Sequence, residues 1–313
     1  MVHALGVAIL VNPYAQPDEW LAELRQALPD ETFWQWPDCA NPDEVEMLVA
    51  WRMRREDLAT FPNLTHILSM GAGTEQWQRE GSPNVPIVRL ADPNMSDEMA
   101  LFALHWVVHF QRGFDVRFGA QDLERWGERS ALSPPEYPVG ILGFGNIGRS
   151  IGEAFQRLGY PVNAWTRSGT DVSNVTSFAG LDELEPFLAA SNAVVNVLPN
   201  TDATRGLLTA QRFAQFRAGA TFVNVGRGTV VASENDLVAA VDSGQLGAAV
   251  LDVTDPEPPA ADSSLFGHPR IVVTPHISGT TQIASAAELI AANIARIRSG
   301  TEPFPVVDKS IGY

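Results

Sequence analysis

The stretch Val139–Gly148, VGILGFGNIG, decides the fold of this 313-residue chain. Its apolar start is typical of a buried strand, and Ile147–Tyr160 has helical periodicity. Between them, the pattern G-x-G-x-x-G allows a tight turn, close approach of a pyrophosphate and close packing of helix on strand. Amides at the helix N-terminus then face the phosphates. We therefore expect a dinucleotide to contact Gly143, Gly145, Asn146, Ile147 and Gly148. The alternative is a strand–turn–helix junction without a ligand.

The end of the next expected strand, Pro161–Trp165, indicates which dinucleotide is bound. A chain that prefers NAD carries Asp or Glu near this place, where the carboxylate hydrogen-bonds the ribose 2′-hydroxyl. This chain has Arg167 and Ser168 instead, a cation and a hydroxyl that suit a 2′-phosphate. The sequence predicts NADP(H) in preference to NAD(H). The alternative is that Arg167 is a solvated loop residue.

Apolar runs alternate with helical patterns along most of the chain, which is typical of parallel-sheet α/β structure. The second half contains six expected strands: Val139–Gly143, Pro161–Trp165, Ala193–Leu198, Thr221–Val225, Ala248–Val253 and Ile271–Thr274. Helices in this half are expected to begin near Asn146, Asp182, Thr204 and Ser233, and at Thr280 or Thr281 for the last helix, Gln282–Arg298.

Strands and helices are expected to alternate in the first half as well. Its expected strands are Gly6–Val11, Thr32–Trp36, Met47–Trp51, Thr65–Met70 and Val85–Leu90. Its expected helices are Asp18–Leu28, a short one at Pro42, one near Glu56–Thr60, and a long one with Ser96 as N-cap and Ala100–Val116 behind it. The polar segment Gln121–Tyr137 is expected to be a linker between the halves.

Chemically distinctive residues follow the expected strands of the second half. Arg227 follows the fourth strand, Asp252 and Glu257 lie at or after the fifth, and His276 follows the sixth. The third strand ends in Leu198-Pro199, which suits packing against an apolar ring. Ligands of open α/β sheets bind beyond the carboxyl ends of the strands, so these residues are expected to meet at one site. Taken singly, His276 is compatible with a strand cap and Glu257 with a loop surface.

Three motifs in this region resemble the signatures of the D-isomer-specific 2-hydroxyacid dehydrogenases. They are Asn224–Gly228 (NVGRG), Leu251–Pro258 (LDVTDPEP) and Thr274–His276 (TPH). Within that family, the chain is most similar to the bacterial glyoxylate/hydroxypyruvate reductases of the A group. This narrower resemblance rests on Leu68–Gly73 (LSMGAG), Trp165–Ser168 (WTRS) and the ending VDK…GY.

The residue types suit reduction of a 2-keto acid, which needs a hydride from the nicotinamide and a proton for the carbonyl oxygen. His276 supplies that proton, and Glu257 hydrogen-bonds the imidazole. Arg227 offers a planar fork to the substrate carboxylate and carbonyl. The resemblance implies that Asp252 holds the nicotinamide carboxamide, and Val225 joins Leu198 and Pro199 as an expected cofactor contact.

The first half is expected to provide the remaining substrate contacts. Gly71, Ala72 and Gly73 follow a strand, and small residues there leave backbone amides available for a carboxylate. The alternative is a tight turn chosen for its shape. Trp51 ends the preceding strand and is expected to face the substrate, as the resemblance suggests, or else to be a core or interface tryptophan.

Composition removes other classes of function. With 37 acidic and 21 basic residues, the net charge of −16 opposes binding to nucleic acid. No apolar run has the ~18 residues of a membrane span, and we expect a cytoplasmic protein. A single cysteine, Cys39, excludes intrachain disulfides and iron–sulfur clusters, and the single lysine, Lys309, excludes a Walker A loop. His105 and His109 have helical spacing but lack the Glu of H-E-x-x-H, so no metal is expected.

These observations predict two α/β domains of Rossmann- or flavodoxin-like parallel sheets, with the active site in the cleft between them. Residues 1–98 and 287–313 form the expected substrate-binding domain, and 99–286 the dinucleotide-binding domain. The resemblance implies NADPH-dependent reduction of glyoxylate or hydroxypyruvate to glycolate or D-glycerate by a homodimer. The alternatives are a dehydrogenase for bulkier keto acids such as phenylpyruvate, and a dinucleotide-sensing protein similar to the C-terminal binding corepressors.

Overall fold

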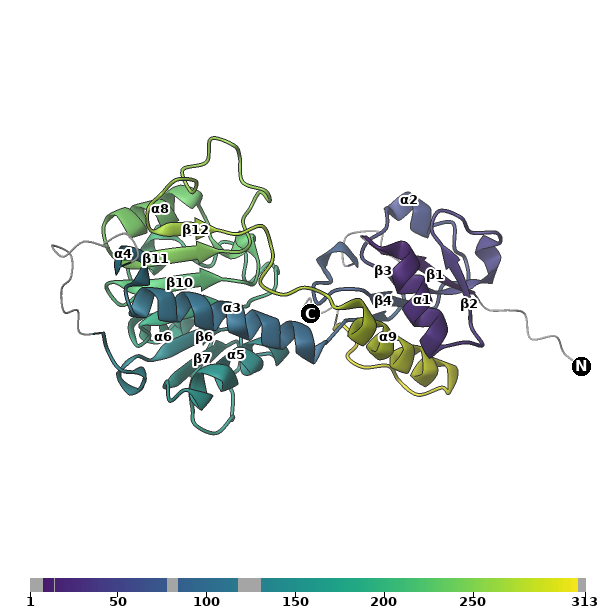
Figure 1. Cartoon of the computed structure of the whole chain (residues 1–313), viewed down its shortest axis with the longest axis horizontal. Helices are drawn as coiled ribbons and strands as arrows, with labels where there is room; N and C mark the ends of the chain where they lie inside the picture. Colours follow the sequence, from purple (N-terminus) through teal and green to yellow (C-terminus); the bar gives the residue numbers. More distant parts are fainter. Residues whose placement is uncertain (1–7, 14, 78–83, 118–130, 309–313) are drawn as a thin grey trace, which may run out of the picture. The chain divides into compact units, whose positions relative to one another are not determined.

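The computed structural model describes residues 8–13, 15–77, 84–117 and 131–308. The chain divides into two compact units (Figure 1). Unit 1 comprises Met1–Met95 and Thr281–Tyr313, and unit 2 comprises Ser96–Thr280. The boundaries expected from the sequence, after residues 98 and 286, lie a few residues further along the chain at both junctions.

Unit 1 is built on a five-stranded parallel sheet in the order β2-β1-β3-β4-β5. The strands are β1 (Ala8–Asn12), β2 (Thr32–Gln35), β3 (Val45–Ala50), β4 (His66–Ser69) and β5 (Ile87–Val88). The register pairs Leu10 with Leu48, Leu48 with Ile67, and Ile67 with Ile87, and all four side chains are fully buried. Gly6 of the expected first strand lies outside the described residues.

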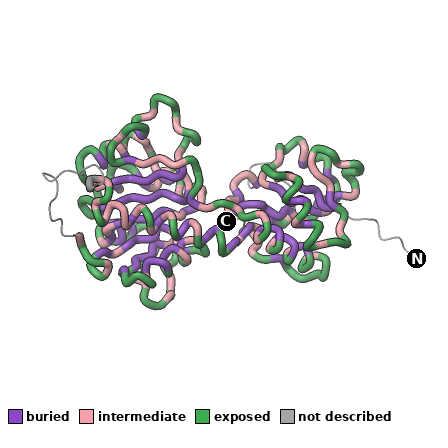
Figure 2. Tube along the Cα trace, viewed as in Figure 1, coloured by how far each residue is buried: buried purple, intermediate pink, exposed green. Residues whose placement is uncertain are grey.

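Helices cover both faces of this sheet. They are α1 (Pro17–Ala27), η1 (Pro42–Glu44), α2 (Arg55–Leu58), η2 (Glu75–Trp77) and α9 (Ile283–Arg298). α1 and α9 lie side by side (Figure 1), although they come from opposite ends of the chain. Leu58 of α2 and Trp77 of η2 join the core cluster on the other side. The strands are therefore buried and the outer helix faces are exposed (Figure 2).

Unit 2 is built on a seven-stranded parallel sheet in the order β12-β11-β10-β9-β6-β7-β8. The strands are β6 (Val139–Leu142), β7 (Val162–Thr166), β8 (Val175–Ala179), β9 (Ala193–Asn196), β10 (Ala220–Asn224), β11 (Leu246–Leu251) and β12 (Ile271–Val273). The helices are α3 (Pro93–Gln111), α4 (Phe114–Arg117), η4 (Pro134–Glu136), α5 (Asn146–Arg157), η5 (Leu181–Glu183), α6 (Leu184–Ala189), α7 (Ala210–Phe213), η6 (Gly228–Val230) and α8 (Glu234–Asp242). Among the helices of the described ranges, none combines the length and apolar character that a membrane crossing requires.

The structure corrects two expectations in unit 2. Strand β8 was not expected, because its sequence VTSFA is mostly polar or small and its side chains are exposed or half-buried at the sheet edge. No helix begins near Thr204. Its hydroxyl instead bonds the Pro199 carbonyl at 2.5 Å and receives the Thr201 amide at 2.9 Å, which stabilises a turn. The helix begins later, at α7, with Thr209 as its N-cap.

The long helix also begins earlier than expected. Ser96 lies inside α3 rather than at its N-cap, because the Asp92 carboxylate accepts the Asn94 amide at 2.9 Å one turn before. The helix ends at Gln111, ahead of Gly113 with φ 63°. Of the expected linker, residues 121–130 lie outside the described residues, and the remainder includes η4.

Candidate active site

The glycine-rich turn joins β6 to α5, and its three glycines occupy three different environments. Gly143 has φ 101°, which side chains rarely adopt. A Cβ on Gly148 would lie 2.1 Å from the Gly143 carbonyl oxygen, so only glycine permits this approach of helix to strand. A Cβ on Gly145, by contrast, would meet nothing within 4 Å. Space is therefore open above the N-terminus of α5, beside Asn146 and Ile147.

The loop after β9 brings a second part of the expected cofactor site to this turn. Leu198 is buried, and its Cδ2 lies 3.1 Å from where a Gly143 Cβ would be. Pro199 follows it half-buried, and Val225, also buried, donates its amide to the Asn196 carbonyl at 3.1 Å. These apolar residues and the glycine turn thus share the carboxyl edge of the sheet.

Two buried oxygens at this edge have no hydrogen-bond partner among the described residues. They are Thr166 Oγ1, at the end of β7, and Asn200 Oδ1, after β9. Buried polar groups are nearly always satisfied by protein, water or a ligand. Together with the open space at Gly145, they fit a bound dinucleotide.

Arg167 and Ser168 follow β7 directly, and both are exposed. The adjoining Trp165 is buried and donates from Nε1 to the Gly180 carbonyl at 2.7 Å, which fixes the end of the strand. Among the residues that the structure describes, the Arg167 guanidinium has no ion-pair partner. Its charge is therefore available to an anion.

Arg227 lies in the turn between β10 and η6 and is half-buried. Its Nη1 donates to the Gly226 carbonyl at 2.7 Å, while Asn224 Nδ2 donates to the Arg227 carbonyl at 3.1 Å. The side chain of Asn224, the last residue of β10, thus holds the turn. Asn224 belongs to the pattern NVGRG, but the sequence analysis assigned a role only to its arginine.

Asp252 is 1% exposed and holds the loop that carries His276. Its Oδ1 accepts from Thr274 Oγ1 at 2.6 Å and from the Ile277 amide at 2.8 Å, and its Oδ2 accepts from the Ser278 amide at 2.8 Å. Its backbone carbonyl accepts from the His276 amide at 3.0 Å. The sequence did not predict these contacts. The contact of Asp252 with the nicotinamide carboxamide, which the family resemblance implies, stays a prediction.

His276 and Glu257 form a hydrogen-bonded pair. Imidazole Nδ1 and carboxylate Oε1 are 2.7 Å apart, and both side chains are 43% exposed. His276 has φ 55°, an uncommon conformation for a residue with a side chain. Since Nδ1 faces Glu257, Nε2 remains for a third group, which is the arrangement expected of a general acid.

In unit 1, the expected substrate residues come together after β3 and β4. A Cβ on Gly71 would lie 2.2 Å from Cζ3 of Trp51, so the indole packs directly on the Gly71 backbone. Gln76 Nε2 donates to the carbonyls of Trp51 and Gly73, at 2.8 and 3.3 Å. Within the described ranges, the amides of Ala72 and Gly73 donate no hydrogen bond. Two consecutive amides with this freedom suit an anion.

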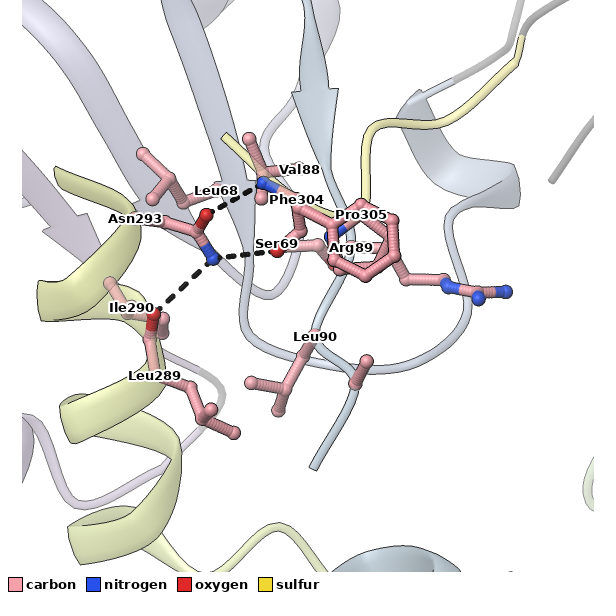
Figure 3. Close-up of a pocket in the computed structure, with 11 residues that line it drawn as sticks. Leu68, Ser69, Val88, Arg89, Leu90, Leu289, Ile290, Asn293, Phe304 and Pro305 are labelled. Carbon is pink, nitrogen blue, oxygen red and sulfur yellow. Dashed lines mark hydrogen bonds between the residues drawn. The ribbon is translucent and has the colours of Figure 1, made fainter. Parts of the chain in front are cut away.

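A pocket of unit 1 and a histidine pair on α3 contain none of the expected site residues. Figure 3 shows a pocket of unit 1 between α9 and the ends of β4 and β5, where Asn293 bonds the Phe304 backbone and the Leu289 carbonyl. None of the expected site residues lines it. The imidazole rings of His105 and His109 on α3 have centroids 5.9 Å apart and planes tilted by 33°. Burial lowers the pKa of the His109 imidazole, with the Asp115 carboxylate acting in the opposite direction. In the part of the chain that the structure describes, no three His, Cys, Asp or Glu side chains gather as metal ligands.

Comparison with known proteins identifies the family. Residues 107–278 match the family described as D-isomer specific 2-hydroxyacid dehydrogenase, NAD binding domain. The chain belongs to the D-isomer specific 2-hydroxyacid dehydrogenases. It is therefore an oxidoreductase, and the match places the NAD-binding domain of this dehydrogenase in unit 2. The family and the fold of two parallel-sheet α/β domains, both predicted from the sequence, are confirmed.

The dehydrogenase has relatives along nearly its whole length. Glyoxylate/hydroxypyruvate reductase A of Serratia proteamaculans is 35% identical, with 97% of this chain and 99% of the relative covered. A crystal structure of a D-isomer specific 2-hydroxyacid dehydrogenase from Xanthobacter autotrophicus Py2, in complex with NADPH and MES, has a TM-score of 0.93 at 35% identity, covering 98% and 99% of the two chains. An NADPH-dependent glyoxylate/hydroxypyruvate reductase from Sinorhizobium meliloti, in complex with NADP and sulfate, has a TM-score of 0.89 at 28% identity with the same coverage.

Proposed function

We propose that this dehydrogenase reduces small 2-keto acids with NADPH, converting glyoxylate to glycolate and hydroxypyruvate to D-glycerate. The observation that carries the proposal is the 2.7 Å pair of His276 and Glu257, held beyond the sheet edge by Asp252. A histidine with one nitrogen on a carboxylate and the other available is suited to deliver a proton to a carbonyl oxygen. The curated relatives named as glyoxylate/hydroxypyruvate reductases support these two substrates.

The nicotinamide, when bound, supplies the hydride that reduces the keto carbon. His276 gives a proton from Nε2 to the carbonyl oxygen, so that the carbonyl becomes a hydroxyl. Glu257 keeps the imidazole oriented through its hydrogen bond to Nδ1. Arg227 binds the substrate carboxylate through the guanidinium plane and polarises the carbonyl. The chain thereby supplies the acid and the electrophilic groups, and the reverse reaction uses His276 as the base.

The proposed preference for NADPH over NADH rests on Arg167 and Ser168. The guanidinium is exposed and the structure gives it no ion-pair partner within the described ranges, which supports a contact with a 2′-phosphate. The glycine turn Gly143–Gly148 holds the pyrophosphate through the amides of α5. Two of the similar structures were solved with NADPH or NADP bound.

In unit 1, the amides of Ala72 and Gly73 are proposed to bind the carboxylate of the keto acid. Trp51 supports this turn, since its ring packs on Gly71 and its carbonyl receives Gln76. Small residues in the turn keep the approach open to a small acid. The proposal therefore assigns Gly71–Gly73 to substrate binding and Trp51 to the wall beside it.

We also propose a homodimer formed through α3. Leu101 on this helix is 68% exposed. Phe102, Trp106 and Phe110 form a chain of ring contacts along it, with successive centroids 6.2 Å apart. Such a surface suits a partner rather than water. Light scattering on the purified chain distinguishes a dimer from a monomer.

The experiment that tests the function is a matrix of kcat/KM values for glyoxylate, hydroxypyruvate and phenylpyruvate, each with NADPH and with NADH. The proposal expects the highest values for the two small acids with NADPH. A clear preference for phenylpyruvate would instead identify a dehydrogenase for bulkier acids. Tight NADPH binding without turnover of any keto acid would refute the proposal and favour a dinucleotide-sensing protein.

A further inference from the structure

Two asparagines with no exposed surface, Asn196 and Asn224, end the neighbouring strands β9 and β10. Asn196 Nδ2 donates to Asn224 Oδ1 at 2.8 Å. The same oxygen accepts the Gly226 amide at 3.2 Å, and Asn224 Nδ2 donates to the Arg227 carbonyl at 3.1 Å. Because a buried amide is costly unless it is hydrogen-bonded, these contacts fix each side chain in one orientation.

Asn196 also holds the loop on the opposite side of this pair. Its Oδ1 accepts the Leu198 amide at 3.3 Å, and its backbone carbonyl accepts the Val225 amide at 3.1 Å. The pair therefore joins the loop of Leu198, on the proposed cofactor side, to the turn that carries Arg227. No group in this chain of contacts is charged except the arginine itself.

Packing leaves the Arg227 backbone little freedom on either side. A Cβ on Gly226 would lie 2.8 Å from Asn196 Nδ2 and 2.8 Å from the Leu198 carbonyl oxygen. A Cβ on Gly228 would lie 2.0 Å from the carbonyl carbon of Thr254, which precedes Asp255 in the loop after β11. Arg227 thus lies between two glycines, Gly226 and Gly228, that contact neighbouring parts of the chain. The Asn224 side-chain amide fixes the position of the Arg227 carbonyl.

We propose that Asn224, oriented by Asn196, is a positioning residue that aims the Arg227 guanidinium at the keto acid. This inference rests on the proposed reduction of keto acids and adds two residues to it. Asn224 acts through the backbone of Arg227 and does not touch the substrate. Replacement of the amide by a carboxylate removes the donor to the Arg227 carbonyl but keeps an oxygen for Asn196 and Gly226.

The test is the variant Asn224→Asp, with Asn163→Asp as the matched control. Asn163 is a buried asparagine in β7 of the same sheet, and its Nδ2 donates to the Ala190 carbonyl at 3.3 Å and to Ser191 Oγ at 3.1 Å. Below the melting temperatures of both variants, we expect Asn224→Asp to lower kcat/KM for glyoxylate by about tenfold or more, with the Kd for NADPH unchanged. The control keeps kcat/KM within about twofold of the wild type.

A double-mutant cycle with Arg227→Ala separates positioning from a general loss of structure. If Asn224 acts through Arg227, Asn224→Asp changes kcat/KM by less than about twofold in the Arg227→Ala background. A full tenfold loss in that background would overturn the inference. So would equal kcat/KM values for Asn224→Asp and Asn163→Asp in an active enzyme. A wild type without turnover is a different result, since it refutes the proposed function itself.

Asn196→Asp provides a second route to the same test. It keeps an acceptor for the Leu198 amide but puts an oxygen opposite Asn224 Oδ1, so Asn224 must turn away from Arg227 or lose a contact. We expect a loss of kcat/KM for the keto acid that again disappears in the Arg227→Ala background. If Asn196→Asp and Asn224→Asp both fail to fold while Asn163→Asp folds, the pair is purely structural and the inference is wrong.

Discussion

Replacement of Asp252 by asparagine tests how the loop that carries His276, the proposed general acid, is held in place. The wild-type carboxylate accepts three hydrogen bonds while 1% exposed, two at Oδ1 and one at Oδ2. In Asp252→Asn, one oxygen retains Thr274 and Ile277, but the new NH2 group faces the Ser278 amide, donor against donor. A buried amide left without an acceptor costs about 1–3 kcal/mol, and loss of charge-assisted bonds adds to it. We expect a total of ~3 kcal/mol.

For a unit of this size, ~3 kcal/mol corresponds to a lower melting temperature by roughly 6–12 °C. Differential scanning calorimetry measures it, and Asp242→Asn is the matched control. That aspartate side chain is 66% exposed and pairs with His268 at 3.1 Å, so its loss should shift melting by about 1–2 °C or less. A melting temperature for Asp252→Asn equal to that of the control would refute the view that this carboxylate holds the 274–278 loop.

Three further predictions concern the chemistry. Glu257→Gln should lower kcat by about tenfold, because the carboxylate that holds the His276 imidazole is lost; a variant with the wild-type kcat would contradict the pairing. Arg227→Lys keeps the charge but loses the planar fork, so steady-state kinetics should show a raised KM for the keto acid together with a lower kcat, and wild-type values for both would dismiss the assignment. Arg167→Asp should lower the affinity for NADPH by roughly ten- to a hundredfold and leave the affinity for NADH unchanged, as measured by kcat/KM for each coenzyme at fixed ionic strength. An unaltered coenzyme preference would show that Arg167 is a solvated loop residue without a role in coenzyme binding.

The local patterns in the sequence were sufficient for the core of the fold. The strand, glycine turn and helix that Val139–Gly148 begins depend on short-range sterics. An apolar run and three glycines in sequence are therefore sufficient to predict them. The edge strand β8 was missed because one partner strand and partial exposure require few apolar residues. The prediction of a helix near Thr204 was wrong because the Thr204 hydroxyl bonds the nearby Pro199 carbonyl, and such a bond competes with helix formation.

The site divides in the same way between near and distant contacts. The pairing of His276 with Glu257, 19 residues apart, was expected because both follow neighbouring strands. The contacts of Asp252 with the 274–278 loop and of Asn224 with Asn196 depend on register between strands. That register is set by packing across the sheet, so local sequence patterns do not predict it. The packing of Trp51 on Gly71 is likewise visible only when β3 and β4 are paired.

The most direct test of the central claim is the amount of glycolate formed per NADPH consumed when glyoxylate is supplied. The wild type should form one glycolate for each NADPH. His276→Ala should bind NADPH with an unchanged Kd but form glycolate about 10²–10⁴-fold more slowly, because it lacks the proton donor. A wild type that consumes no NADPH with any small keto acid, or a His276→Ala variant as fast as the wild type, would contradict the account.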